Sequence, residues 1–140
     1  MFEIGIIDEF EAAHRLIGNF GPATRLHGHT YRVETRVWSR HIGSDGVFYD
    51  LGLLRADLRA VLAKMHYRDL GELPELSGTN TTVEQVARYI FTELEPPLRA
   101  AGLFALKVTV WESSFVFGAY YEEFEPTAQG ANPANLASGG

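Results

Sequence analysis

The order of the periodic segments is the feature that most restricts how this chain can fold. Two stretches alternate apolar and polar residues, two stretches then carry apolar residues at helical spacing, and two more alternating stretches follow. This order predicts an α+β domain in which two helices cover one face of a four-stranded antiparallel sheet. No internal repeat or central linker interrupts the pattern, so we expect a single domain over residues 1–125.

Four segments carry the strand predictions. Residues 2–10 alternate and continue toward His14, and residues 31–37 place every second residue on one half-buried face. Residues 106–112 and 117–124 show the same alternation near the end of the chain. Because so small a sheet has exposed edges, we expect the protein to oligomerise with its sheets joined edge to edge.

Two helices are predicted between these strands. The first covers residues 51 to about 67 and has Asp50 as its N-cap. Its apolar stripe consists of Leu54, Leu58, Val61, Leu62 and Met65. The second begins at Thr81, because Thr81 and Glu84 have the spacing of a capping box, and the pair Pro96-Pro97 is expected to end or kink it.

Composition excludes several classes of protein. The chain has 12 Lys and Arg against 18 Asp and Glu, and this acidic balance disfavours nucleic acid as a partner. No run approaches the ~18 apolar residues of a membrane span, and the first residues lack the order of a signal peptide. We therefore expect a cytoplasmic protein with no membrane partner. Residues 126–140 have almost nothing to bury, so a disordered tail is expected there.

The tripeptide His27-Gly28-His29 is the strongest indication of chemistry. On a strand, residues two apart point to the same side and can present two imidazoles to one ion. An antiparallel pairing of the first two strands would bring His14 toward the same place. Three neutral imidazoles with an open fourth position are typical of a catalytic zinc site. For the H-x-H pattern alone, ordinary core or surface histidines are the alternative, and the third histidine favours the metal.

Glu112 is the second candidate site residue. Alternation places it on the same face as the apolar residues Leu106, Val108 and Val110. A carboxylate on an apolar face is costly unless something pairs with it. It could accept hydrogen bonds from adjacent N–H donors, such as the amino-pyrimidinone edge of a pterin or a guanine. The alternatives are a carboxylate that turns to solvent or one that forms a salt bridge.

Five short motifs together resemble the 6-pyruvoyl-tetrahydropterin synthase family, which includes the 6-carboxytetrahydropterin synthases of the queuosine pathway. The resemblance covers residues 1 to about 124 and implies the tunnelling fold, or T-fold. It also implies a homohexamer of two stacked trimers, with active sites at the subunit interfaces. The motifs are F-E-A-A-H-R-L at residues 10–16, L-H-G-H-T-Y at 26–31, D-L-G at 50–52, N-T-T-V-E at 80–84 and W-E-S at 111–113.

The resemblance also implies roles for individual residues. The family's zinc would be held by His14, His27 and His29, and its pterin would be anchored by Glu112. Thr82 lies in the helix-start motif, which suggests that it touches the pterin as well, although the preceding residue is threonine where the family often has proline. An ordinary helix-start residue is the alternative for Thr82.

The chain departs from the family at the residues that move protons. The family's usual base is a cysteine four residues before the H-G-H motif, and Ala23 occupies that position in a chain without cysteine. The family's Asp-His pair aligns with His66 and Tyr67, or with Met65 and His66 in a register shifted by one. His66, zinc-bound hydroxide and, as an acid, Tyr67 are therefore candidates for proton transfer. A helix-terminal cation and interface packing are the alternatives for His66 and Tyr67.

Taken together, these features predict a zinc-dependent protein similar to 6-pyruvoyl-tetrahydropterin synthase. Its substrate would be a dihydropterin of the dihydroneopterin type or a related purine-derived compound. The reaction would be that of a lyase, breaking a carbon–oxygen or carbon–carbon bond with a base other than cysteine. The alternative is a catalytically inactive pterin-binding sensor or carrier, because both proton-transfer elements are altered. A structural oligomer with an incidental metal is a third hypothesis.

Overall fold

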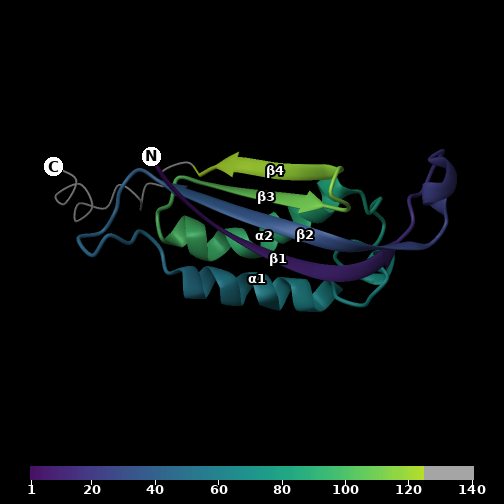
Figure 1. Ribbon diagram of the computed structural model, residues 1–140, viewed down its shortest axis with the longest axis horizontal. Helices are drawn as coiled ribbons and strands as arrows, with labels where there is room; N and C mark the ends of the chain where they lie inside the picture. Colours follow the sequence, from purple (N-terminus) through teal and green to yellow (C-terminus); the bar gives the residue numbers. More distant parts are fainter. Residues whose placement is uncertain (125–140) are drawn as a thin grey trace.

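A layer of strands is covered on one face by a layer of helices (Figure 1). The structure is a computed structural model that describes residues 1–124, so the tail expected at residues 126–140 lies outside the described residues. The sheet is antiparallel throughout, and its strands lie side by side in the order in which they occur along the chain. These strands are β1 (Phe2–His14), β2 (His27–Ser39), β3 (Ala105–Trp111) and β4 (Phe117–Glu123).

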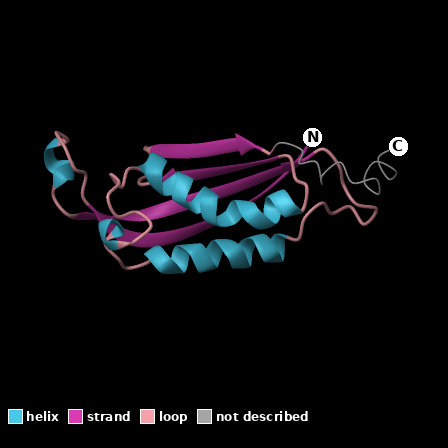
Figure 2. Cartoon of the chain, turned by 180° about the vertical axis from the view of Figure 1, so that it is seen from behind, coloured by secondary structure: helices cyan, strands magenta, loops and turns pink. Residues whose placement is uncertain are grey.

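Both long helices pack on the same face of the sheet (Figure 2). They are α1 (Leu51–Met65) and α2 (Val83–Ala100), and two short 3₁₀ helices, η1 (Gly21–Thr24) and η2 (Leu70–Glu72), lie in the connections. The predicted α+β architecture is therefore confirmed. Among the residues that the structure describes, no helix is long and apolar enough to cross a membrane.

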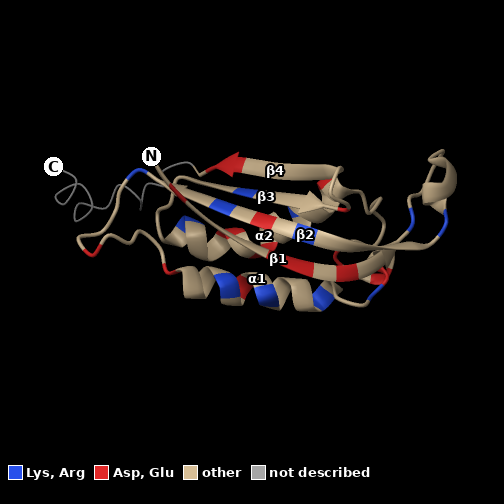
Figure 3. Cartoon of the chain, in the orientation of Figure 1, with Lys and Arg blue, Asp and Glu red and all other residues tan. Residues whose placement is uncertain are grey.

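The core lies between the sheet and the two helices. Every second residue of β2 from Tyr31 to Val37 is fully buried, and the whole predicted stripe of α1 is buried in the same core, where α1 packs on β1 and α2. Charged residues occur along β1, β2 and β3 (Figure 3), and on β2 they alternate with the buried residues and so lie on the face opposite the helices. On β2 these are Arg32, Glu34 and Arg36, which form ion pairs with one another. The alternation along β2 thus separates the core from a charged surface.

The pairing of β1 with β2 sets the position of the histidines. The two strands pair along their whole length, from Phe2 opposite Ser39 at one end to His14 opposite His27 at the other. His29 lies opposite Ala12, two residues further along the ladder, so its side chain points to the same face as those of His14 and His27. All three histidines therefore lie at the same end of the sheet.

Helix α1 ends at Met65, two residues before the expected end near Tyr67. The chain leaves the helix there because it pairs with the outer edge of β1. The N–H of Tyr67 donates to the carbonyl of Glu11 at 2.6 Å, and the N–H of Ala13 donates to the carbonyl of Arg68 at 2.9 Å. Tyr67 also has a left-handed backbone, with φ of 57°, which no helix can continue through.

Helix α2 differs from its predicted limits at both ends. Its N-cap is Thr82 rather than Thr81, and the Thr82 hydroxyl accepts a hydrogen bond from the N–H of Gln85 at 3.3 Å. The pair Pro96-Pro97 does not end the helix, which continues to Ala100. Leu98 is only 1% exposed, so burial of its side chain holds the last turn although the prolines lack the N–H groups of that turn.

Candidate metal centre

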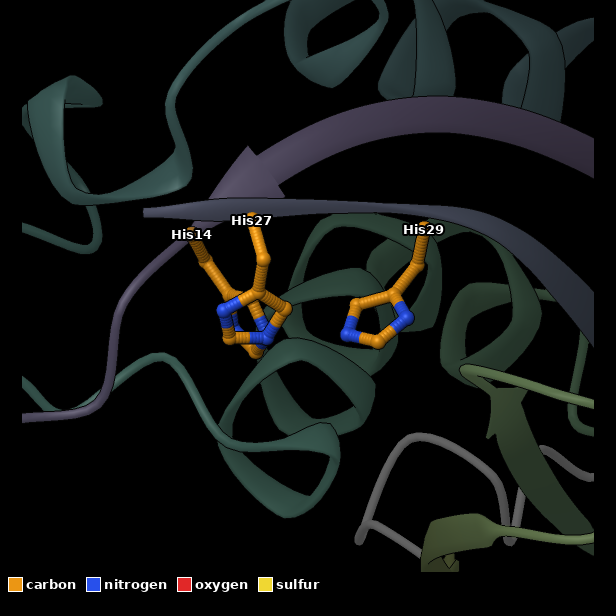
Figure 4. A group of neighbouring side chains, drawn as sticks. All are labelled: His14, His27 and His29. Atoms are coloured by element: carbon orange, nitrogen blue, oxygen red, sulfur yellow. The ribbon is translucent and has the colours of Figure 1, made fainter. Parts of the chain in front are cut away.

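Three imidazole rings meet where the β1–β2 pairing ends (Figure 4). His14 is the last residue of β1, and His27 and His29 begin β2. One nitrogen of each ring lies within 4.8 Å of a nitrogen of both others. The ring centroids are 4.5, 5.1 and 4.9 Å apart for the pairs 14–27, 14–29 and 27–29. The strand pairing therefore brings the three side chains together, as the sequence predicts.

Backbone carbonyls hold two of these rings by their Nδ1 atoms. Nδ1 of His14 donates to the carbonyl of Thr81 at 2.7 Å, and Nδ1 of His27 donates to the carbonyl of Arg25 at 2.6 Å. A carbonyl can only accept, so each neutral ring carries its proton on Nδ1 and keeps a lone pair on Nε2. Metal-binding histidines are commonly oriented by such a hydrogen bond from the ring nitrogen that does not bind the metal.

The remaining nitrogens fit a cation. Nε2 of His14 and Nε2 of His29 are buried and have no hydrogen-bond partner. A buried polar atom without a partner is unfavourable, and a metal ion that accepts the lone pair would remove this cost. Three neutral imidazoles suit zinc and several other transition metals. His14, His27 and His29, called here the histidine cluster, could therefore hold such an ion.

Burial keeps His14 and His29 in the neutral form that binds metals. Desolvation lowers the pKa of His14 and of His29, and the neighbouring imidazoles lower both pKa values further. The Glu112 carboxylate raises the pKa of His29, but burial outweighs it. Both rings are therefore neutral at pH 7, and their lone pairs are free for a ligand bond.

Glu112 lies beside the histidine cluster rather than in the core. Strand β3 ends one residue earlier, and the N–H of Glu112 donates to the carbonyl of Val116 in the turn toward β4. Its Oε2 is 3.8 Å from Nε2 of His29, and its side chain is 27% exposed. The carboxylate therefore lies close to the cluster and is still accessible to a ligand from solvent.

Tyr31 separates the histidine cluster from the core, a position that the sequence analysis did not identify as functional. Its side chain is fully buried, and its ring centroid lies 5.4 Å from that of His29 and 6.0 Å from that of His14. The ring stacks on Phe10, and the hydroxyl has no hydrogen-bond partner. Burial raises the pKa of Tyr31 well above its ordinary value, so the phenol stays protonated.

The loop before α2 contacts the cluster through a residue that was not singled out. Thr81 is buried, and besides its carbonyl its hydroxyl lies 3.4 Å from Nδ1 of His14. Thr82, the residue implied by the family resemblance, uses its hydroxyl to cap the helix. The sequence motif was therefore a valid signal for this loop, but the direct contact with the cluster comes from the preceding residue.

His66 and Tyr67 lie along the outer edge of β1, just after α1 ends. Nδ1 of His66 accepts a hydrogen bond from the N–H of Glu11 at 3.1 Å, and the ring of Tyr67, a residue that is 77% exposed, lies tilted by 31° against the His66 ring with the centroids 3.9 Å apart. The hydrogen bond of His66, like that of the Tyr67 N–H with the carbonyl of Glu11, is made to the backbone of β1 at the edge of the sheet, whereas the histidine cluster lies at the end of the β1–β2 pairing. One chain therefore does not place these two rings among the three histidines.

An open cavity of about 550 Å³ adjoins this region. Its lining includes Glu11, Thr30 and Tyr67, and it reaches His29.

Ala23, the residue at the position where the family resemblance implies a cysteine, lies in η1, where its carbonyl accepts from the N–H of Leu16. An alanine methyl group can neither accept nor donate a proton, so η1 contributes no base at that position.

Comparisons with known proteins agree with this fold. A family model described as 6-pyruvoyl tetrahydropterin synthase matches residues 3–123. A 6-pyruvoyl tetrahydrobiopterin synthase of Dictyostelium discoideum is 28% identical over 119 residues, which cover 76% of this chain and 87% of that protein. A 6-carboxy-5,6,7,8-tetrahydropterin synthase of Synechocystis is 37% identical over 90 residues, covering 61% and 69%.

Solved structures support the same conclusion. The structure of 6-pyruvoyl tetrahydropterin synthase from Caenorhabditis elegans matches with a TM-score of 0.77 at 27% identity, covering 86% of this chain and 95% of that one. The Plasmodium falciparum protein matches with a TM-score of 0.73 at 19% identity, which shows the fold alone. The predicted tunnelling fold is therefore confirmed.

Proposed function

The chain belongs to the 6-pyruvoyl tetrahydropterin synthase family, and on that basis we propose that it is a zinc-dependent lyase acting on a dihydropterin of the dihydroneopterin type. The observation that carries this proposal is the histidine cluster, in which the buried Nε2 atoms of His14 and His29 have no partner and that of His29 lies 3.8 Å from the accessible carboxylate of Glu112. The names of the relatives support a pterin substrate.

In this proposal, His14, His27 and His29 hold the zinc. Bound zinc would polarise the side-chain oxygens of the substrate and lower the pKa of a bound water. The protein's contribution is to orient two of the three rings before the metal binds, because backbone carbonyls already hold Nδ1 of His14 and of His27. The buried ring of Tyr31 packs beside His29 and closes the cluster on the side that faces the core.

Glu112 is proposed to anchor the heterocycle. A carboxylate can accept two hydrogen bonds, which suits the adjacent N–H donors of an amino-pyrimidinone ring. Because Oε2 lies only 3.8 Å from Nε2 of His29, a pterin held there would have its side chain near the cluster. Thr82 is proposed as a second contact, since its hydroxyl accepts from Gln85 and can still donate its own proton.

Proton transfer is assigned to His66 and Tyr67 of a neighbouring copy. The lone pair on Nδ1 of His66 is taken by the N–H of Glu11, so the neutral ring carries its proton on Nε2 and can donate it. The exposed Tyr67 ring is accessible to another subunit. We therefore propose a homohexamer of two trimers, in which these residues reach the histidine cluster of an adjacent chain.

A pterin-binding sensor or carrier is the second candidate function. It is favoured by Ala23, which cannot carry a proton, and by the engaged lone pair of His66, which leaves that nitrogen unable to act as a base. Such a protein would keep the histidine cluster and Glu112 for binding. Both functions therefore predict a pterin complex, and they differ only in turnover.

The test is to incubate the zinc-loaded protein with 7,8-dihydroneopterin and with its triphosphate, and to follow products by mass spectrometry and binding by calorimetry. The lyase proposal expects a product whose mass identifies the broken bond, and expects none with His27→Ala. Pterin binding without a product would support the sensor or carrier. No binding of either compound would contradict both functions.

A further inference from the structure

The metal ligand at the end of β1 lies where strand pairing stops. The pairing of β1 with β2 ends at His14 and His27, so the ladder does not hold the chain beyond His14. The N–H of Leu16 donates to the carbonyl of Ala23, which ties the start of the connection to its own later part. This contact leaves the connection free to move relative to the helices, and something else must fix it.

Asn80 supplies this attachment through both ends of its side-chain amide. Oδ1 of Asn80 accepts from the N–H of Ile17 at 2.9 Å, and Nδ2 donates to the carbonyl of Ile17 at 3.1 Å. The two residues are 63 positions apart in the sequence. The Ile17 side chain is 70% exposed, so its burial does not hold the chain here. The two hydrogen bonds therefore join the chain just after His14 to the loop before α2.

The same loop holds the His14 ring. The carbonyl of Thr81 accepts from Nδ1 of His14, and the next residue, Thr82, caps α2. The N–H of Thr82 also donates to the carbonyl of Asn80 at 2.8 Å, which closes a tight turn. Three consecutive residues thus bind the backbone after the ligand, the ring of the ligand and the start of the helix.

We propose that Asn80 is a positioning residue for the metal centre. By holding Ile17, it keeps the His14 backbone at the distance from which the Thr81 carbonyl can orient the ring. The loss of this hold lets His14 move away from the other two rings and lowers the affinity for zinc. The inference rests on the proposed zinc site, and it adds a residue that touches neither the metal nor the substrate.

The main experiment compares zinc affinity and stability in Asn80→Ala. We expect the dissociation constant for zinc, measured by competition with a chromophoric chelator, to rise by up to about 10-fold, the lower end of the effect of removing a direct hydrogen-bond partner of a metal ligand, because Asn80 acts on His14 only through the backbone. The zinc-free melting temperature should fall by no more than about 5 °C, because only two partly exposed hydrogen bonds are lost. The visible absorption of the cobalt-substituted protein should change as well, because it reports the ligand geometry.

Two matched controls separate positioning from general loosening. Ile17→Ala keeps the backbone groups that Asn80 binds, so it should leave zinc affinity unchanged. Asp45→Ala removes a similar hydrogen bond, to the N–H of Val47, in the loop beyond the opposite end of the sheet, and should also leave zinc affinity unchanged. Asn80→Ser keeps a polar side chain that is too short to bridge both groups of Ile17, so it should bind zinc as weakly as Asn80→Ala.

The outcomes distinguish this inference from the proposed function. Wild-type affinity for zinc in Asn80→Ala and Asn80→Ser would overturn the positioning role while leaving the zinc site in place. An equal loss of affinity in Ile17→Ala would overturn it too, because the contact to the backbone would then not be the cause. Absence of zinc binding by the wild-type protein would contradict the proposed function itself.

Discussion

The histidine cluster and the segment from His66 to Asp69 lie on either side of β1, and they are built in opposite ways. In the cluster, carbonyls of the same chain hold the rings of His14 and His27, and burial lowers the pKa of His14 and of His29. In the segment, His66 is exposed, Tyr67 is 77% exposed, and the backbone at Tyr67 is left-handed. One region is organised within the chain, and the other faces outward.

This difference indicates which parts of the function belong to a single chain. A metal site that is oriented before the metal binds needs no partner to form, so changes in the cluster should alter metal binding in any state of assembly. The segment instead presents its rings to the surroundings. Strain of the kind seen at Tyr67 persists where the surrounding structure enforces it, and it is often found at functional sites. Changes in the segment should therefore alter turnover and leave the metal in place.

The largest expected effect is the loss of a ligand from the cluster. His27→Ala should weaken zinc binding by more than about 100-fold, the upper limit expected when only a hydrogen-bond partner of a ligand is removed, because it removes one of the three imidazole nitrogens that would bind the metal. Metal analysis after dialysis should find no stoichiometric zinc. The control is His41→Ala, because His41 is exposed in the loop at the other end of the sheet. Equal zinc content in both variants would remove the cluster from the account.

Glu112→Gln tests whether the carboxylate serves the ligand or the metal. Loss of a charge-assisted anchor should weaken the binding of a pterin by about 10- to 100-fold, measured by calorimetry on the zinc-loaded protein. Zinc affinity should stay as in the wild type. Glu9→Gln, an exposed carboxylate on the other face of β1, is the matched control. A loss of zinc in Glu112→Gln would instead make this residue part of the metal site.

Acid should destabilise the zinc-free protein through the cluster. The pKa values of His14 and His29 lie below the ordinary value in the folded state, mainly because of burial, so the unfolded chain binds more protons in mildly acidic solution. The free energy of unfolding should therefore be constant above about pH 7.5 and fall as the pH drops through and below about 6.5. Urea denaturation between pH 5.5 and 8 measures this slope. It should become smaller in His29→Gln and stay unchanged in His41→Ala, and an unchanged slope in both would contradict the assignment.

The smallest effect is expected at the strained residue of the segment. Tyr67→Gly should raise the free energy of unfolding by up to about 1 kcal/mol, because glycine adopts a left-handed backbone without strain and this gain exceeds its entropic cost. Arg68→Gly, at an exposed neighbour without positive φ, should instead lower it by about 0.5–1 kcal/mol. Thermal or urea unfolding compares the two. Equal destabilisation would show that Tyr67 is not strained.

Local patterns predicted most of the fold. Alternation identified the strands, and the apolar stripe identified α1, because these signals depend only on neighbouring residues. The errors lie where distant segments decide the outcome. Helix α1 ends early because its continuation pairs with β1 at Glu11, and α2 continues past its prolines because the core buries Leu98. Neither contact is visible in the local sequence.

For the site, the sequence was enough to predict which histidines come together but not which groups orient them. The spacing of His27 and His29 and the pairing of two strands were enough to bring His14 beside them. The groups that orient the rings were not predictable, because they are backbone carbonyls, such as that of Thr81, and any residue type can supply one. The hydrogen bond between His66 and the backbone of Glu11 was not predictable either, since it joins residues 55 positions apart.

The central claim is that three imidazoles of one chain hold a zinc ion. X-ray absorption at the zinc edge of the zinc-loaded protein tests it most directly, because scattering by the imidazole rings gives the number of histidines bound to the metal. The account predicts three imidazole nitrogens at about 2.0–2.1 Å from the metal in the wild type and two in His27→Ala. A shell with fewer than three imidazoles in the wild type, or one that His27→Ala leaves unchanged, would contradict it.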